Sequence, residues 1–267
     1  MNKTIVTSMV SMAGLGFFFA SILAIVNEKL KVKEDPRVEK LEAALPGVNC
    51  GACGFASCRQ YAESLAKGES TPIQCKAGGS EVIGSLSGIL GVGLETKAKE
   101  MAIVHCGADA SKRSKKAVYF GMKTCAAAKN VQGGEILCDY GCLGYGDCKT
   151  ECPFGAITLV NGLPGIDKEK CTACGKCAKA CPCGLITLEK IDSRKFLYVA
   201  CSNMDKGPET RKTCAVGCIA CGICQRLTAG IFHIDKNAAY VNYDKIEEIE
   251  DADEVVGKCP TKCILKI

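Results

Sequence analysis

The sequence is poor in residues that many enzymes use for catalysis and for core packing. It has no tryptophan, two histidines in 267 residues and 6% aromatic residues. His105 and His233 are isolated, so we interpret both as structural, and no Ser–His or Cys–His arrangement for hydrolysis is visible. The glycine-rich stretch 78–93 lacks the Lys-Ser/Thr of a phosphate loop, which predicts no nucleotide or flavin site. A net charge of +5, without a basic stripe interleaved with aromatics, argues against nucleic-acid binding.

Cysteine, in contrast, is abundant, with 22 residues. A secreted disulfide scaffold would scatter its cysteines through a short chain. Here most of them fall in tight C-x-x-C groups, several followed by proline, which is typical of bacterial iron–sulfur ligation. Metal–ligand bonds would also compensate for a small aromatic core. Because thiolate ligands must stay reduced, we expect this part of the chain in a reducing compartment.

The N-terminal residues 4–26 carry no charge. As a helix they would span about 34 Å, enough for a bilayer core of about 30 Å. A cleaved signal peptide would have a shorter apolar stretch and a more basic start, so we predict a retained anchor.

Gly16, Ala20 and Ala24 form a small-residue stripe, either a contact face for another helix or ordinary membrane-helix composition. One basic residue precedes the span and five follow closely, which predicts the rest of the chain in the cytoplasm: Lys3, then Lys29, Lys31, Lys33, Arg37 and Lys40.

The first cysteine group directly follows this region, in the sequence CGACGFASC with one more cysteine downstream. The glycines let backbone N–H groups turn toward a cluster. Zinc is the competing interpretation, but zinc sites usually show a second close pair of ligands. We therefore predict a [4Fe–4S] cluster held by Cys50, Cys53, Cys58 and Cys75.

The next two groups each end in Cys-Pro. In two-cluster ferredoxins the fourth cysteine of each run ligates the other cluster. This rule predicts one [4Fe–4S] cluster on Cys138, Cys142, Cys148 and Cys181, and a second on Cys171, Cys174, Cys177 and Cys152. The first run departs from the usual spacing, with three and then five residues between ligands. An internal repeat, CPFGAITL at 152 and CPCGLITL at 181, predicts a strand after each Cys-Pro pair.

The last group has Thr228 where a fourth cysteine would stand, and the following triplet is missing. By the crossed rule, Cys259 completes a single [4Fe–4S] cluster with Cys218, Cys221 and Cys224. The alternative is that Cys259 is unrelated and that the site holds three irons or none. On this assignment, replacing Cys259 by serine should remove one of four clusters and leave three.

Six cysteines lie outside these sets: Cys106, Cys125, Cys183, Cys201, Cys214 and Cys263. We interpret Cys183 and Cys263 as small buried apolar residues. The other four repeat a strand-like VHC or VAC followed by KTCA. They could form a fifth metal site, but their spacing matches no zinc or iron–sulfur pattern, so we favour simple packing. The basic run at 111–116 is interpreted as a solvated loop, or alternatively as a docking surface for an acidic electron carrier.

These patterns predict an α+β protein with a transmembrane anchor, a small helical [4Fe–4S] domain and two bacterial ferredoxin-like modules, the C-terminal one with a single cluster. Segments 37–47 and 58–68 should be helices that flank the first cysteines. The expected divisions are the anchor 1–27, a linker 28–34, the N-terminal cluster domain 35–95, connecting segment 96–130, two-cluster ferredoxin domain 131–192, connecting segment 193–208 and single-cluster domain 209–267.

The order of anchor, CGACG domain and ferredoxin modules resembles the B subunit of the Rnf complex, an ion-translocating ferredoxin:NAD oxidoreductase. The resemblance implies an electron-transfer subunit in the cytoplasmic membrane that receives electrons from reduced ferredoxin. It would pass them to membrane and flavin subunits that reduce NAD while Na⁺ or H⁺ is moved. Two alternatives are a tethered reductase that maintains another iron–sulfur protein or redox sensor, and a zinc-holding scaffold.

Overall fold

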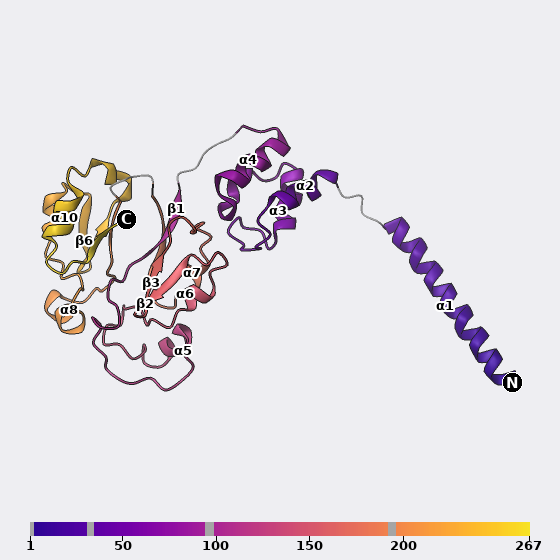
Figure 1. The fold of residues 1–267 in the computed structure, drawn as a ribbon, viewed down its shortest axis with the longest axis horizontal. Helices are drawn as coiled ribbons and strands as arrows, with labels where there is room; N and C mark the ends of the chain where they lie inside the picture. Colours follow the sequence, from indigo (N-terminus) through magenta and orange to yellow (C-terminus); the bar gives the residue numbers. More distant parts are fainter. Residues whose placement is uncertain (1–2, 31–34, 94–98, 192–195) are drawn as a thin grey trace.

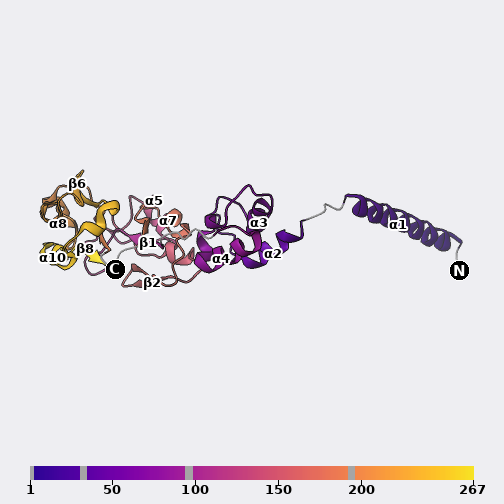
Figure 2. The same ribbon diagram turned by 90° about the horizontal axis from the view of Figure 1, so that it is seen from above.

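A computed structural model describes residues 3–30, 35–93, 99–191 and 196–267 (Figure 1). Seen from above, helix α1, a small helical domain and a larger mixed region follow one another along the long axis (Figure 2). The predicted α+β class with one N-terminal apolar helix is confirmed.

Helix α1 (Lys3–Leu30) is formed by the uncharged N-terminal segment. Its stretch Ile5–Lys29 has a mean hydropathy of 2.2 and is long and apolar enough to cross a membrane. Large side chains such as Phe17 and Leu23 are 78% and 67% exposed, so they pack against no other described part of the protein. Apolar side chains left in this state suit insertion into a bilayer.

The small domain consists of α2 (Pro36–Ala44), α3 (Cys58–Ala66) and α4 (Gly79–Leu90), with the short 3₁₀ turns Pro72–Gln74 and Lys76–Gly78. Asp35 caps α2 by accepting from the backbone N–H of Arg37 at 2.9 Å, and Ser57 caps α3 through the N–H of Gln60. The two helices predicted around the first cysteines are therefore confirmed. Their apolar faces form a core with α4: Val38, Leu41, Tyr61, Leu65 and Leu86.

The first ferredoxin-like unit contains two antiparallel strand pairs. Strand β2 (Ile157–Val160) pairs with β3 (Leu163–Ile166), and β4 (Ile186–Lys190) pairs with β1 (Glu100–Val104). The strands predicted after Cys152 and Cys181 are confirmed as β2 and β4. The expected connecting segment 96–130 supplies both β1 and α5 (Cys125–Asn130). Two short helices, α6 (Asp147–Thr150) and α7 (Lys176–Ala180), follow the cysteine loops.

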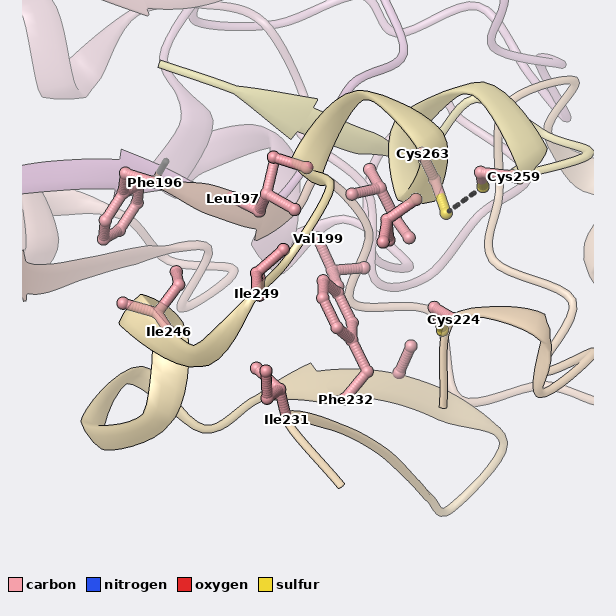
Figure 3. Close-up of a cluster of buried hydrophobic side chains, with 14 of the residues drawn as sticks. Phe196, Leu197, Val199, Cys224, Ile231, Phe232, Ile246, Ile249, Cys259 and Cys263 are labelled. Carbon is pink, nitrogen blue, oxygen red and sulfur yellow. Dashed lines mark hydrogen bonds between the residues drawn. The ribbon is translucent and has the colours of Figure 1, made fainter. Parts of the chain in front are cut away.

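The second unit repeats this plan. Strand β6 (Phe232–Asp235) pairs with β7 (Ala238–Val241), and β5 (Leu197–Val199) pairs with β8 (Ile264–Lys266). Its helices are α8 (Gly207–Thr213), α9 (Ile223–Leu227) and α10 (Ala252–Lys258), with the 3₁₀ helix Tyr243–Glu248. Phe196, Leu197 and Phe232 pack at the centre of its core (Figure 3).

Polar contacts join the three cysteine-bearing parts. Lys76 of the small domain pairs with Glu100 of β1, with 2.7 Å between Nζ and Oε2. The ring of His105 links the two ferredoxin-like units, because Nδ1 lies 2.8 Å from the carbonyl oxygen of Val199 and Nε2 lies 2.9 Å from Thr187 Oγ1. Both ring nitrogens of His105 are thus engaged, as expected of a structural histidine.

Candidate metal centres

Set I comprises Cys50, Cys53, Cys58 and Cys75, which line one cavity of about 340 Å³. Gly51 and Gly54 have φ of 73° and 89°, which lets the loop fold tightly between the cysteines. Burial raises the pKa of Cys75 to about 11, and the thiols of Cys53, Cys58 and Cys50 also raise it, while the backbone N–H of Gly78 lowers it. The structure therefore brings this predicted set together.

Set II comprises Cys152, Cys171, Cys174 and Cys177, around a cavity of about 330 Å³. The backbone N–H of Ala102 in β1 donates to Cys171 Sγ at 3.5 Å. Thr172 Oγ1 is buried at this cavity, and no described protein group accepts or donates a hydrogen bond to it. A sulfide of a bound cluster would offer that hydroxyl an acceptor, so the residues present fit an iron–sulfur group.

Set III comprises Cys142, Cys148 and Cys181, which line a cavity of about 410 Å³. Cys142, Cys148 and Cys181 meet here as predicted, but Cys138 does not line this cavity. Two further cysteines, Cys125 and Cys183, for which the sequence pattern favoured simple packing, also line it. The sequence signal for Cys125 was its KTCA repeat, which gave no ligand spacing.

Set IV lines a cavity of about 400 Å³ between the two ferredoxin-like units. It consists of Cys138 and three cysteines without an assigned role, Cys106, Cys201 and Cys214. The segments that carry them are far apart in sequence. Strand pairing places Cys106 after β1 and Cys201 after β5, and the isolated bridges Arg113–Cys214 and Lys115–Ile136 bring in the segments of Cys214 and Cys138.

Set V comprises Cys218, Cys221, Cys224 and Cys259 of the C-terminal unit. Three of them are buried in its core, whereas Cys221 is exposed. Cys263 Sγ lies 3.7 Å from Cys259 Sγ (Figure 3), and its thiol lowers the pKa of both Cys259 and Cys218 by hydrogen bonding. Thr228 has a structural role, because its hydroxyl donates to the carbonyl of Cys224 at 2.8 Å and accepts from the N–H of Phe232 at 3.1 Å.

In sets I to IV the thiols surround a space instead of meeting at a point. Among the described residues, no three His, Cys, Asp or Glu side chains are grouped tightly enough to hold a single metal ion. Zinc needs four ligands at about 2.3 Å from one centre. Thiols spread around a cavity, with backbone N–H groups directed at sulfur, favour a cluster with a volume of its own.

Comparison with known families supports this chemistry. Residues 45–77 match a family model for an Fe-S cluster, residues 163–186 match a 4Fe-4S binding domain, and residues 215–265 match the 4Fe-4S single cluster domain of ferredoxin I. The last match confirms the prediction that the C-terminal module is of the single-cluster type.

Three relatives match nearly the whole chain. The B subunit of the Na⁺-translocating ferredoxin:NAD⁺ oxidoreductase complex of Acetobacterium woodii is 38% identical, covering 93% of this chain and 74% of that protein. The B subunit of the ion-translocating oxidoreductase complex of Methanosarcina acetivorans is 35% identical, covering 99% of both. The chain belongs to the family of Rnf B subunits. A third member, from the proton-translocating ferredoxin:NAD⁺ oxidoreductase complex of Clostridium ljungdahlii, is 36% identical; the match covers 99% of this chain and 93% of that protein.

Membership in the family of Rnf B subunits confirms the resemblance found in the sequence. The chain is an iron–sulfur electron-transfer subunit of an Rnf-type complex. Its 4Fe-4S domains are the parts of the chain that match this role.

Proposed function

We propose that this subunit receives electrons from reduced soluble ferredoxin and delivers them to membrane and flavin subunits of its complex. Those subunits would reduce NAD⁺ while Na⁺ or H⁺ crosses the membrane. The names of the relatives support this proposal, because they describe ferredoxin:NAD⁺ oxidoreductases that translocate Na⁺ or H⁺. We propose that sets I, II and V each ligate one [4Fe–4S] cluster, and that Cys142, Cys148 and Cys181 ligate another.

One observation carries the proposal: the cysteine sets follow one another through the protein. Burial raises the pKa of Cys174 in set II, and the nearby Cys50 thiol of set I raises it further. Burial likewise raises the pKa of Cys177 to about 12, with a contribution from Cys148 of set III. When bound, the clusters supply one-electron redox chemistry. The chain holds their proposed ligands in successive sets that begin in the domain nearest α1.

We further propose that α1 lies in the cytoplasmic membrane with all cysteine sets on the cytoplasmic side. The basic residues after the span support this orientation. Protease added to inside-out vesicles should digest the cluster-bearing part, whereas protease added to right-side-out cells should leave it intact. Digestion in intact cells would contradict the orientation.

The function is tested in inside-out vesicles from cells that lack this subunit and carry a plasmid copy. Reduced ferredoxin should drive NAD⁺ reduction with Na⁺ or H⁺ uptake when the wild-type subunit is present. Cys152→Ala, which removes one proposed ligand of set II, should abolish both activities, while Glu209→Gln, an exposed side chain outside the basic run 111–116, should retain them. Full NAD⁺ reduction without this subunit would contradict the proposal. Reduction of a different iron–sulfur protein without ion uptake would support a tethered reductase instead.

A further inference from the structure

The first Cys-Pro run has an unexplained gap when it is aligned with the second. If both runs are superposed at their C-x₃-C-P ends, Cys148 matches Cys177 and Cys142 matches Cys171. The position that corresponds to Cys174 is then occupied by Tyr145. The first run therefore lacks its second ligand, and Cys138 stands four residues before the position of the first one.

The structure fills this gap with Cys125. Its side chain is 8% exposed and lines the same cavity as Cys142, Cys148 and Cys181. Asp147, next to Cys148, fixes the start of α5: its Oδ1 accepts from the N–H of Cys125 at 2.7 Å and its Oδ2 accepts from the N–H of Ala126 at 3.0 Å. Cys125 is thus tied directly to the loop that carries a predicted ligand.

With Cys125 in the fourth ligand position of set III, Cys138 is not needed there, and it lines the cavity of set IV instead. We propose that set IV (Cys106, Cys138, Cys201 and Cys214) ligates a fifth [4Fe–4S] cluster between the two ferredoxin-like units, and that Cys125 completes the cluster of Cys142, Cys148 and Cys181. This inference rests on the proposed function as an electron carrier. Ligation replaces four thiol protons by four sulfur–iron bonds, and insertion of a preassembled cluster needs no oxidant or reductant.

Hydrogen-bond donors are already directed at the sulfur atoms of set IV. Asn203 is 1% exposed, and its Nδ2 donates to Cys138 Sγ at 3.4 Å. The amide is held in this orientation because its Oδ1 accepts from the N–H of Asp205 at 2.7 Å and from Thr210 Oγ1 at 3.3 Å. Backbone N–H groups of Cys218 and Asn203 donate to Cys201 Sγ at 3.2 and 3.5 Å. Such bonds stabilise cluster thiolates and tune their potential.

A cationic side chain also faces set IV. Arg113 lines the cavity, and its Nε and Nη2 donate to the carbonyls of Ala108 and Gly162 at 2.6 and 2.9 Å. Its Nη1 donates to the carbonyl of Cys142, a member of set III. The guanidinium is therefore fixed beside both sets, where its charge offsets that of thiolate ligands. This member of the basic run is built into the protein, whereas its neighbours in 111–116 are exposed.

Set IV lies beside set III on one side and set V on the other. On the near side, Arg113 lines the cavity of set IV and donates its Nη1 to the carbonyl of Cys142 in set III. On the far side, Cys218 of set V donates its backbone N–H to Cys201. A cluster in set IV would therefore connect the first ferredoxin-like unit with the single-cluster unit. The repeated VHC and VAC segments supply Cys106 and Cys201, one from each unit.

Iron content tests the fifth site without any activity measurement. Full-length protein, purified anaerobically in detergent, should contain about 20 iron and about 20 acid-labile sulfide per chain, whereas four clusters would give about 16 of each. A value of about 16 in protein that is fully loaded by reconstitution would overturn the inference. This measurement needs no variant, so a variant that fails to fold does not affect it.

Paired alanine variants test the ligand assignment. Cys138→Ala with Cys214→Ala should lose one cluster, because both belong to set IV. Cys138→Ala with Cys125→Ala should lose two, since the residues belong to different sets. Cys183→Ala is the matched control, because Cys183 also lines the cavity of set III but is not an assigned ligand. This variant should lose no cluster. Loss of a single cluster in the Cys125/Cys138 pair would restore the crossed assignment and refute ours. Failure of ferredoxin-driven NAD⁺ reduction with 20 irons present would instead contradict the proposed function alone.

Discussion

Replacing Arg113 by methionine should destabilise the folded protein by roughly 3 kcal/mol. The guanidinium donates to the carbonyls of Ala108, Cys142 and Gly162. Hydrogen bonds to a charged group contribute about 1.5–3 kcal/mol each, so three would give at least about 4.5 kcal/mol. We take a lower value because only Ala108 is fully buried, and water can reach the other two half-buried residues after the substitution.

The assay is thermal unfolding of the cluster-loaded protein, followed anaerobically by circular dichroism and visible absorbance. A loss of about 3 kcal/mol corresponds to a fall in apparent Tm of roughly 6–12 °C for a chain of this size. Lys112→Met is the matched control, because Lys112 is exposed and only pairs with Asp109 at 3.3 Å, so its Tm should hardly change. If the Arg113 variant has the same Tm as the control, the three hydrogen bonds from Arg113 to backbone carbonyls do not stabilise the protein as we infer.

Three other substitutions or deletions have defined expected outcomes. Cys259→Ala should remove the cluster of set V and leave the others, as counted by iron content and by electron paramagnetic resonance of the reduced protein. An unchanged iron content would exclude Cys259 as a ligand. Tyr61→Phe should lower the free energy of unfolding, measured by chemical denaturation, by about 1 kcal/mol, because the buried Tyr61 hydroxyl donates to the carbonyl of Thr71 at 2.6 Å. An unchanged free energy of unfolding would show that water replaces this bond. Deleting residues 1–30 should move the protein from the membrane to the soluble fraction with its full iron content. The apolar stretch Ile5–Lys29 of α1 buries no residue against the rest of the described chain, so loss of iron would contradict an anchor-only role.

Local patterns predicted the parts whose ligands are close in sequence. Set I and set II were recognisable because each contains a close C-x₂-C group, and the crossed-ligand rule then assigned the more distant Cys152 to set II. The strands after Cys152 and Cys181 followed from alternating apolar residues, and the first helices followed from apolar spacing and a terminal Pro-Gly. The domain boundaries stay predictions. The structure adds that segments 96–130 and 193–208 supply β1 and β5, which pair with strands far along the chain.

Set IV could not be predicted from spacing, because its cysteines come from distant segments that only tertiary pairing brings together. The exchange between Cys125 and Cys138 was detectable in principle. Counting from the Cys-Pro end places Tyr145 at a ligand position, whereas counting from the first cysteine of the run conceals it. Arg113 was hidden for a different reason: a run of basic residues indicates solvent exposure on average, and it does not reveal which member turns inward.

Metal analysis of the anaerobically purified, full-length protein tests the central claim most directly. We predict iron and acid-labile sulfide in equal amounts, bound in clusters that reduced ferredoxin can reduce, with no stoichiometric zinc. A colourless protein without iron, or a protein loaded with zinc on these same cysteines, would contradict that claim.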